Sequence, residues 1–214
     1  MARKPADQSV SRDDIIHAAA DVLRDNGYDA TTMKDIASRV NLTAASLYHH
    51  FKNKDFLLLA VLEIGLGRAI EQIQPIVDSD QCASAKLREM IASHICDVTD
   101  NPAVGAAMVF EIKALMNANS AGRDLEDQDE FDQRRKAFFA HRDYFEKLFR
   151  DTIKEGIHAG EFRPVDAAIV AKAMLGAHNW VGVWYKAGGR LSGMEIAKIM
   201  TDTFLAALRV DNDE

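Results

Sequence analysis

The chain has 214 residues, of which 48% are hydrophobic, and a formal net charge of -7. This apolar content can fill one sizeable core or two small ones, which excludes a largely disordered chain. No apolar run reaches the length of a membrane span, and the start "MARKPADQSV" has none after its charges. Because Cys82 and Cys96 also lack the spacing of a disulfide framework, we expect a cytoplasmic protein that makes no membrane contact.

The charge is distributed unevenly along the chain. Residues 1–55 contain eight basic and eight acidic residues, so the remainder carries the whole negative excess. Overall negative charge argues against nucleic acid as a partner, because binding to phosphates depends on basic side chains that release counterions. This argument does not apply to the N-terminal segment, which has no net charge. Because DNA would repel an acidic body, only the N-terminal segment is expected to approach DNA.

Apolar residues recur at helical spacing and strand-like alternation is rare, so the sequence predicts an all-α fold. Ser11 is expected to cap a first helix that ends at Asn26, with Gly27 as its stop. "NANSAGRDLEDQDE" is the one long polar segment and is expected to be flexible. Later helices are expected at about 55–74, closed by Pro75, and at about 80–99, 103–117, 127–157, 166–187 and 192–209. Ser192, with Glu195 three residues later, is expected to form a capping box at the start of the last helix.

A helix-turn-helix pattern follows the first helix. A second helix should begin after Thr31 or Thr32 and end near Val40. Asn41 then tolerates the left-handed backbone conformation that a tight reversal needs, and Thr43 caps a short third helix, "AASLYHHF". Two short helices joined in this way are typical of DNA-binding proteins.

The third helix has the composition of a recognition helix. Small residues at its start allow close approach to base edges, while Leu47 and Phe51, four residues apart, dock it inward. Hydroxyl and imidazole groups on the other side can donate to phosphates, and Lys54 would add its charge to the positive end of the next helix. The groove side of this helix is expected to be Thr43, Ser46, Tyr48, His49 and His50, and Thr31 or Thr32 could hold a phosphate on the other side of the groove.

The adjacent histidines could instead suggest a metal site. His49 and His50 point about 100° apart on a helix, so they cannot chelate one ion from the same face. No nearby cysteine or well-spaced carboxylate completes a ligand set, and no nucleophile is paired with a base. We therefore expect no metal, no cofactor and no catalytic residue.

The string "TTMKDIASRVNLTAASLYHHFKNKDFLLLAV" resembles the DNA-binding domain of the tetracycline-repressor (TetR) family of bacterial regulators. It matches the family pattern of Thr-Thr, Ile-Ala, a turn, and Leu-Tyr-x-His-Phe-x-x-Lys, and the resemblance covers residues 11–60, about a quarter of the chain. By the family pattern, the expected DNA contacts are Thr32, Thr43, Ser46, Tyr48, His49 and Lys54. Asn41 stands where the family usually has glycine. The resemblance implies a flexible arm at 1–10, a DNA-binding domain at 11–53, and a helical ligand-binding and dimerisation domain at 54–214.

The body supplies candidates for a ligand site. Its aromatic residues are core by default, but "LGAHNWVGVWYKAGG" places Trp180 and Trp184 on one helix face, where they can form either a ligand wall or a dimer seam. Asn179 and His178 are the polar groups best able to orient a ligand. The expected ligand contacts are Phe110, Phe145, Phe149, His178, Asn179, Trp180 and Trp184.

By the same resemblance, residues 166–187 and 192–209 pair with a partner copy to form a homodimer that binds a palindromic DNA operator. "HNWVGVWY" is also similar to a branch that responds to acyl-CoA thioesters, with arginines of the long helix, Arg134, Arg135, Arg142 and Arg150, available for phosphates. We predict a repressor released by a small apolar effector. Two alternatives stay open: a helical small-molecule-binding protein, and a DNA-binding protein without an effector.

Overall fold

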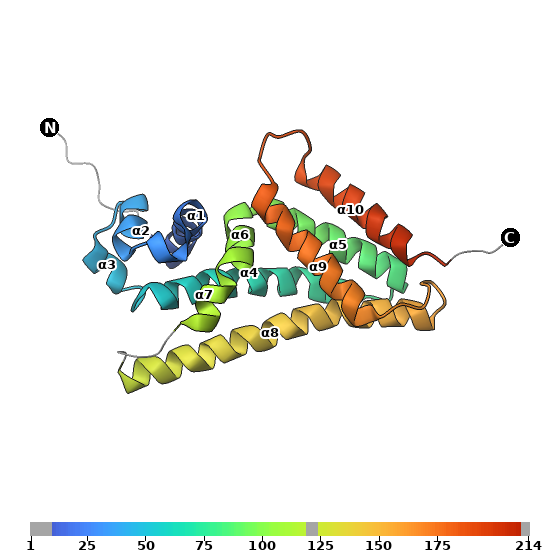
Figure 1. Ribbon diagram of the computed structural model, residues 1–214, viewed down its shortest axis with the longest axis horizontal. Helices are drawn as coiled ribbons and strands as arrows, with labels where there is room; N and C mark the ends of the chain where they lie inside the picture. Colours follow the sequence, from blue (N-terminus) through green and yellow to red (C-terminus); the bar gives the residue numbers. More distant parts are fainter. Residues whose placement is uncertain (1–9, 119–123, 211–214) are drawn as a thin grey trace.

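The computed structural model describes residues 10–118 and 124–210, and within them the chain forms ten α-helices and no strand (Figure 1). The all-α prediction is therefore confirmed. Of the expected N-terminal arm, residues 1–9 lie outside the described residues. The helices are α1 Arg12–Ala30, α2 Met33–Arg39, α3 Ala44–Tyr48, α4 Lys54–Val77, α5 Ala83–Asp100, α6 Pro102–Phe110, α7 Ile112–Asn117, α8 Leu125–His158, α9 Ala167–Trp184 and α10 Gly193–Leu208.

Side-chain caps begin the helices where the sequence predicts them. Ser11 forms a capping box at the start of α1, and Ser192 does the same for α10. Between the two candidate caps of α2 the structure selects Thr32, which accepts from the Asp35 backbone N–H. Thr31 is buried instead, and its hydroxyl donates to the Gly27 carbonyl at 2.7 Å.

Two residues with positive φ set the course of the chain in the N-terminal region. Gly27 has a φ of 75°, so the regular part of α1 ends there as expected, although the helical hydrogen bonds resume through Ala30. Asn41 has a φ of 57° and makes the reversal between α2 and α3. This left-handed conformation confirms the role predicted for Asn41 in the turn.

Three expected boundaries in the body are wrong. Pro75 does not close α4, because the donors after it still find carbonyls: the Asp78 N–H bonds to the Gln74 oxygen at 3.0 Å. The helix expected at 103–117 is broken at Glu111 into α6 and α7. The polar segment is helical from Leu125 onward because Asp124 caps α8, while residues 119–123 lie outside the described residues.

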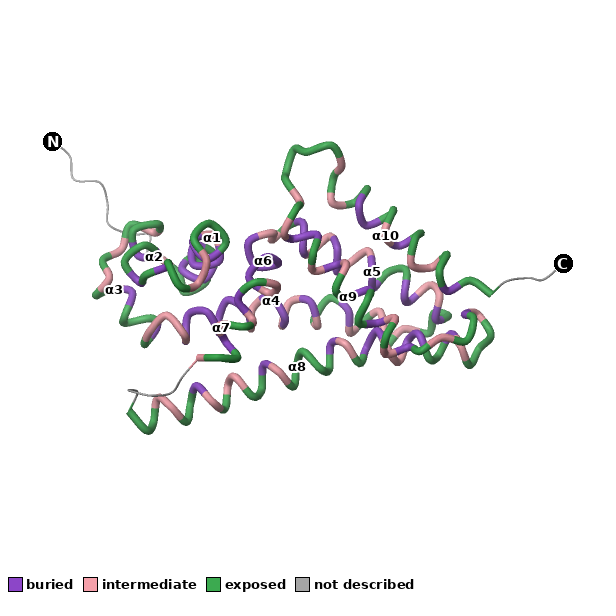
Figure 2. The backbone as a smooth tube through the Cα atoms, in the orientation of Figure 1, coloured by how far each residue is buried: buried purple, intermediate pink, exposed green. Residues whose placement is uncertain are grey.

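The helices form a small head, α1 to α3, at one end of an elongated body (Figure 1). Helix α4 leaves the head and runs through the body beside the long α8, and α5 lies among α4, α8, α9 and α10. Helix α1 packs against both α4 and α6. Buried positions run through α1, α4 and α6, where head and body meet (Figure 2).

Glycines let α6 lie close to two neighbours. A side chain at Gly65 in α4 would collide with Val104 of α6. On the other side, a Cβ at Gly182 in α9 would come within 3.0 Å of the Gly105 backbone. Helix α6 is therefore held tightly between α4 and α9, and a shift of α6 must be accommodated by both.

Replacement of Asn41 tests the turn. We expect Asn41→Val to lower the free energy of unfolding by about 1–2 kcal/mol, because a β-branched residue is strained at positive φ. Asn41→Gly, which has no Cβ, should leave stability equal or slightly higher. Urea denaturation measures both. Equal midpoints for the two variants would contradict the turn geometry.

Candidate functional site

Helix α3 presents one exposed edge at the end of the head. Thr43 caps it by accepting from the Ser46 N–H at 3.0 Å, and the two hydroxyls lie 2.8 Å apart. Leu47 is completely buried, whereas Tyr48 is 53% exposed. The inward face expected for this helix is therefore present, and the outward face carries phenol and imidazole groups.

Five of the six expected DNA contacts are available for binding. Thr32, Thr43, Tyr48 and His49 are exposed and Ser46 is partly exposed, all of them on α2, α3 or their caps. These helices pack against each other at the end of the molecule opposite α10 (Figure 1). The arrangement suits insertion of α3 into a groove with the α2 cap near a flanking phosphate.

Lys54 is placed differently from the rest. Its ammonium donates to the Tyr28 carbonyl at 2.6 Å and to the Thr31 carbonyl at 2.8 Å, and lies 4.1 Å from the centre of the Tyr28 ring. These bonds hold the final turn of α1 against the start of α4. A phosphate contact by Lys54 stays a prediction, and any phosphate would share the ammonium with these two carbonyls.

Tyr28 joins three parts of the molecule, and sequence reasoning missed it. Besides accepting from Lys54, it donates its hydroxyl to Asp55 of α4 and its backbone N–H to Glu111 at 3.2 Å. Glu111 is buried at the junction of α6 and α7, and burial raises the pKa of its carboxyl group. The end of α1 is thus tied to α4 and to the α6–α7 junction.

A second connection links the head to α8. Lys52, in the turn after α3, forms ion pairs with Asp127 and with Glu130, the latter at 2.7 Å. Hydrogen bonds to Asp127 and then Glu130 raise the pKa of the Lys52 ammonium above its ordinary value. Further along α8, Arg134 pairs with Glu63 of α4 at 2.5 Å. These contacts align the first turns of α8 with the head.

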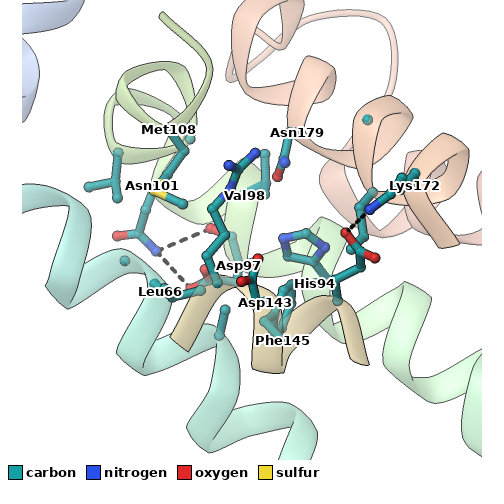
Figure 3. A pocket seen from close by; sticks show the side chains of 18 residues that line it. Leu66, His94, Asp97, Val98, Asn101, Met108, Asp143, Phe145, Lys172 and Asn179 are labelled. Carbon is teal, nitrogen blue, oxygen red and sulfur yellow. Dashed lines mark hydrogen bonds and ion pairs between the residues drawn. The ribbon is translucent and has the colours of Figure 1, made fainter. Parts of the chain in front are cut away.

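A cavity of about 370 Å³ lies in the body among α4, α5, α6, α8 and α9 (Figure 3). This volume lies within the range of small-molecule sites. Its apolar wall is formed mainly by Leu66, Val98, Val104, Met108, Phe145 and Leu175. Its polar and charged lining residues are His94, Asp97, Asn101, Arg142, Asp143, Glu146, Lys172 and Asn179.

Most charged groups of the lining are already paired. Asp97 lies 2.9 Å from the Arg68 guanidinium, although burial still raises the pKa of its carboxyl group. Lys172 donates to Glu146 at 2.6 Å across the gap between α9 and α8. Arg142, exposed at the cavity edge, forms no hydrogen bond or ion pair with any part of the chain that the structure describes. It is the cation available to an incoming anion.

Two buried histidines meet at the inner wall. The Nδ1 atoms of His94 and His178 are 3.3 Å apart, and their exposed fractions are 6% and 0%. Phe145, Phe149 and Phe204 pack edge-on or tilted against the two rings. Burial lowers the pKa of His94 to about 4 and that of His178 well below its ordinary value, so both rings are neutral near pH 7.

The cavity includes only part of the expected ligand set. Phe145 and Asn179 line it, and Phe149 and His178 lie behind it in contact with His94. Phe110, Trp180 and Trp184 do not line it and are about half exposed, so a ligand contact by these three residues stays a prediction. The two tryptophans lie outside the cavity because of helical phase, since α9 turns the stripe of Lys172, Leu175, Gly176 and Asn179 toward it.

Sequence reasoning also missed His94, the ring that faces the cavity. Its spacing on α5 agrees with the buried positions Met90, Ile91 and Val98, so it could be recognised as a core position but not as part of a site. In the described residues no group of three or more His, Cys, Asp or Glu could hold a metal ion. Nor does any helix there have the length and apolar character of a membrane span.

Comparison with known proteins identifies the class. Residues 15–61 match the family model described as bacterial regulatory proteins of the tetR family, and residues 80–208 match a tetracyclin repressor-like C-terminal domain. The chain therefore belongs to the TetR family of bacterial transcriptional regulators, which are DNA-binding proteins and not enzymes. It is 30% identical over 196 residues to the HTH-type transcriptional repressor KstR2 of Mycolicibacterium smegmatis, covering 91% of this chain and 88% of that protein.

Solved structures agree with this assignment. The TetR family regulator PfmR from Thermus thermophilus has a TM-score of 0.76 and 26% identity, covering 90% of this chain and 97% of its own. AibR, solved in complex with isovaleryl coenzyme A and operator DNA, has a TM-score of 0.69 and 25% identity, covering 92% and 97% of the two chains. A regulator of this fold therefore binds an acyl-CoA and DNA together.

Acid should destabilise the protein through its buried histidines. Between about pH 6.5, the ordinary histidine value, and about pH 4, the unfolded chain binds protons that the folded chain excludes, so stability falls as pH falls through this window. The free energy of unfolding should fall by about 2 kcal/mol between pH 7 and pH 5 through His94 alone. Urea denaturation at the two pH values measures it.

His94→Phe should reduce this pH dependence, because the substituted ring cannot be protonated. The matched control is His158→Phe, since His158 is exposed at the end of α8 and lies outside the buried histidine pair. The comparison uses the change in stability between the two pH values, which does not depend on how stable each variant is. An unchanged loss in His94→Phe would show that His94 is not buried in its neutral form.

Proposed function

We propose that the protein is a homodimeric repressor whose grip on a palindromic operator is released when an acyl-CoA thioester occupies the cavity. The observation that carries the proposal is the position of the cavity. It is bounded by α4 and α6, and these are also the body helices that pack against α1 of the head. A ligand that moves either helix therefore acts on the DNA-binding end.

The head supplies the DNA contacts. Tyr48 and His49 at the exposed end of α3 would donate to phosphates or lean on sugars, while Thr43 and Ser46 face base edges. Thr32, the N-cap of α2, would hold a flanking phosphate together with the N-terminus of that helix. Two copies would present their α3 helices about 34–36 Å apart, one turn of DNA.

Exposed apolar residues on α9 and α10 support a dimer through these helices. Trp180 and Trp184 project from α9, and the ring of Trp180 lies 6.1 Å from that of Phe110 on α6. Met194 and Ile199 are exposed on α10. Apolar surface of this kind is typical of protein interfaces and needs a partner to cover it. The two tryptophans are therefore assigned to the seam between subunits.

Cavity chemistry and the AibR complex favour an acyl-CoA as the effector. The acyl chain would occupy the apolar wall, and the nucleotide phosphates would remain at the open edge, where Arg142 has no competing partner within the described chain. Of the other arginines suggested for phosphates, Arg134 and Arg150 are engaged with Glu63 and Glu146. The AibR complex shows that a related fold holds such a thioester.

The release mechanism would be a shift between two arrangements of α4 and α6. A ligand changes this equilibrium only by the difference in its affinity for the two states. Because Gly65 and Gly182 leave no space around α6, a ligand beside Val104 cannot be accommodated by α6 alone. The displacement would pass to Tyr28 through α4 and Glu111, and so alter the spacing of the two heads.

Tyr48→Ala tests the DNA interface. We expect at least a tenfold loss of affinity for the duplex selected by the wild type from random sequences, because a phosphate-positioning group at the groove is removed. Gel shift measures affinity, and analytical ultracentrifugation should show the same dimer as the wild type. Lys136→Ala, an exposed change on α8, serves as the control. Full affinity in Tyr48→Ala would contradict the interface.

Release by hexanoyl-CoA tests the effector class. The compound should dissociate the wild-type protein from its selected duplex, whereas free CoA should not, because the acyl chain provides the apolar contact. Arg142→Ala should require about tenfold more hexanoyl-CoA, equivalent to losing one charge-assisted contact. Lys136→Ala is again the control. Retention of DNA at saturating hexanoyl-CoA would contradict release by this class of ligand.

A further inference from the structure

His94 is the only histidine in the described cavity lining, and its neighbours determine which of its ring nitrogens can donate a hydrogen bond to a ligand. The imidazole stands among the labelled lining residues with Asn179 above it and Phe145 below it (Figure 3). One ring nitrogen, Nδ1, is engaged with Nδ1 of His178 at 3.3 Å. The other ring nitrogen, Nε2, has no hydrogen-bond partner in the described chain. It is not one of the fully buried unpartnered atoms, so a ligand in the cavity can reach it.

The state of His178 decides which nitrogen of His94 carries the proton. In two neutral imidazoles joined through their Nδ1 atoms, one donates and the other accepts, so the outer nitrogens have opposite roles. Nε2 of His178 is buried without a partner within the described residues. An orphaned buried N–H is costlier than an unused lone pair, so His178 should carry its proton on Nδ1. His94 then accepts at Nδ1 and carries its own proton on Nε2.

The charges around the ring select the ligand group that can meet this donor. The lining contains three carboxylates, Asp97, Asp143 and Glu146, and two cations, Arg142 and Lys172, of which Lys172 is paired with Glu146. Asp97 lies one helical turn from His94 on α5. Because Asp97 is paired with Arg68 and Glu146 with Lys172, Arg142 is the one cation of the described lining left for a charged group. The phosphates of the proposed effector would occupy Arg142, so the acceptor that meets His94 should be uncharged.

We propose that His94 donates its Nε2–H to an uncharged carbonyl oxygen of the effector, and that His178 is the positioning residue that holds His94 in the donating tautomer. The inference rests on the proposed function for the identity of the ligand, and for an acyl-CoA the acceptor is the thioester oxygen. This role explains why two histidines are buried in contact with each other at the inner wall of the cavity. It also predicts that the site distinguishes a thioester from the corresponding thioether.

A pair of ligands that differ only in the carbonyl tests the contact. Isothermal titration calorimetry compares hexanoyl-CoA with S-hexyl-CoA, which has a CH₂ in place of the carbonyl carbon. The wild type should bind the thioester about tenfold more tightly, the effect of one hydrogen bond. In His94→Phe the two ligands should bind equally, and in the control His158→Phe the tenfold preference should remain.

The tautomers can be measured directly without any ligand. In the full-length protein, histidine ¹⁵N chemical shifts distinguish a protonated ring nitrogen from an unprotonated one. We expect the proton of His94 on Nε2 and that of His178 on Nδ1. The reverse arrangement, which an aromatic face such as that of Phe204 could favour by accepting an N–H from His178, would overturn the role of His178.

The outcomes separate the inference from the proposed function. Equal binding of both compounds to the wild type overturns the carbonyl contact and leaves the acyl-CoA effector standing. If neither compound binds, the proposed effector fails and the carbonyl contact fails with it, while the nitrogen shifts still decide the tautomers. If His94→Phe does not fold, His94→Gln replaces it. Its amide can donate to the carbonyl, so a retained preference supports the contact and a lost preference opposes it.

Discussion

The arrangement of the molecule depends on the contacts of Tyr28. A single residue after the Gly27 bend accepts from Lys54, donates to Asp55 and donates to Glu111, so α1, α4 and the α6–α7 junction meet at one point. Most of these bonds involve a charged partner in a half-buried setting, where such bonds are stronger than neutral ones. The head is consequently fixed to the body by a small polar cluster. Small movements of α4 or α6 would therefore act on α1, and through α2 on α3.

The cavity and this cluster are connected through α6. Close packing at Gly65 and Gly182 leaves α6 no independent freedom, so its position depends on both α4 and α9. The cavity touches all three helices, and α9 carries the exposed tryptophans on an adjoining face. One helix thus lies between the proposed ligand site and the proposed dimer seam. Ligand, seam and head share a continuous set of packed contacts, which is the physical requirement for coupling between sites.

Local sequence signals succeeded where the interaction is local. The caps at Ser11 and Ser192, the reversal at Asn41 and the inward side of α3 all depend on residues within four positions of one another, and the structure confirms each. Contacts between distant residues have no such signal. The two carbonyls that accept hydrogen bonds from Lys54 lie 23 and 26 residues earlier in the chain, and no local pattern points to them.

By itself the sequence determined the all-α class, the position of the recognition helix and the resemblance to the TetR family. Each of these depends on residues that are close together in the sequence: the hydrophobic periodicity, the helix caps and the helix-turn-helix motif. Only the tertiary structure decided which side of α9 faces a cavity, that Trp180 and Trp184 lie outside it, and that His94 meets His178. A helix presents several faces of similar composition. Which face becomes a wall and which a surface depends on neighbours brought together by folding, and periodicity within one helix cannot specify them.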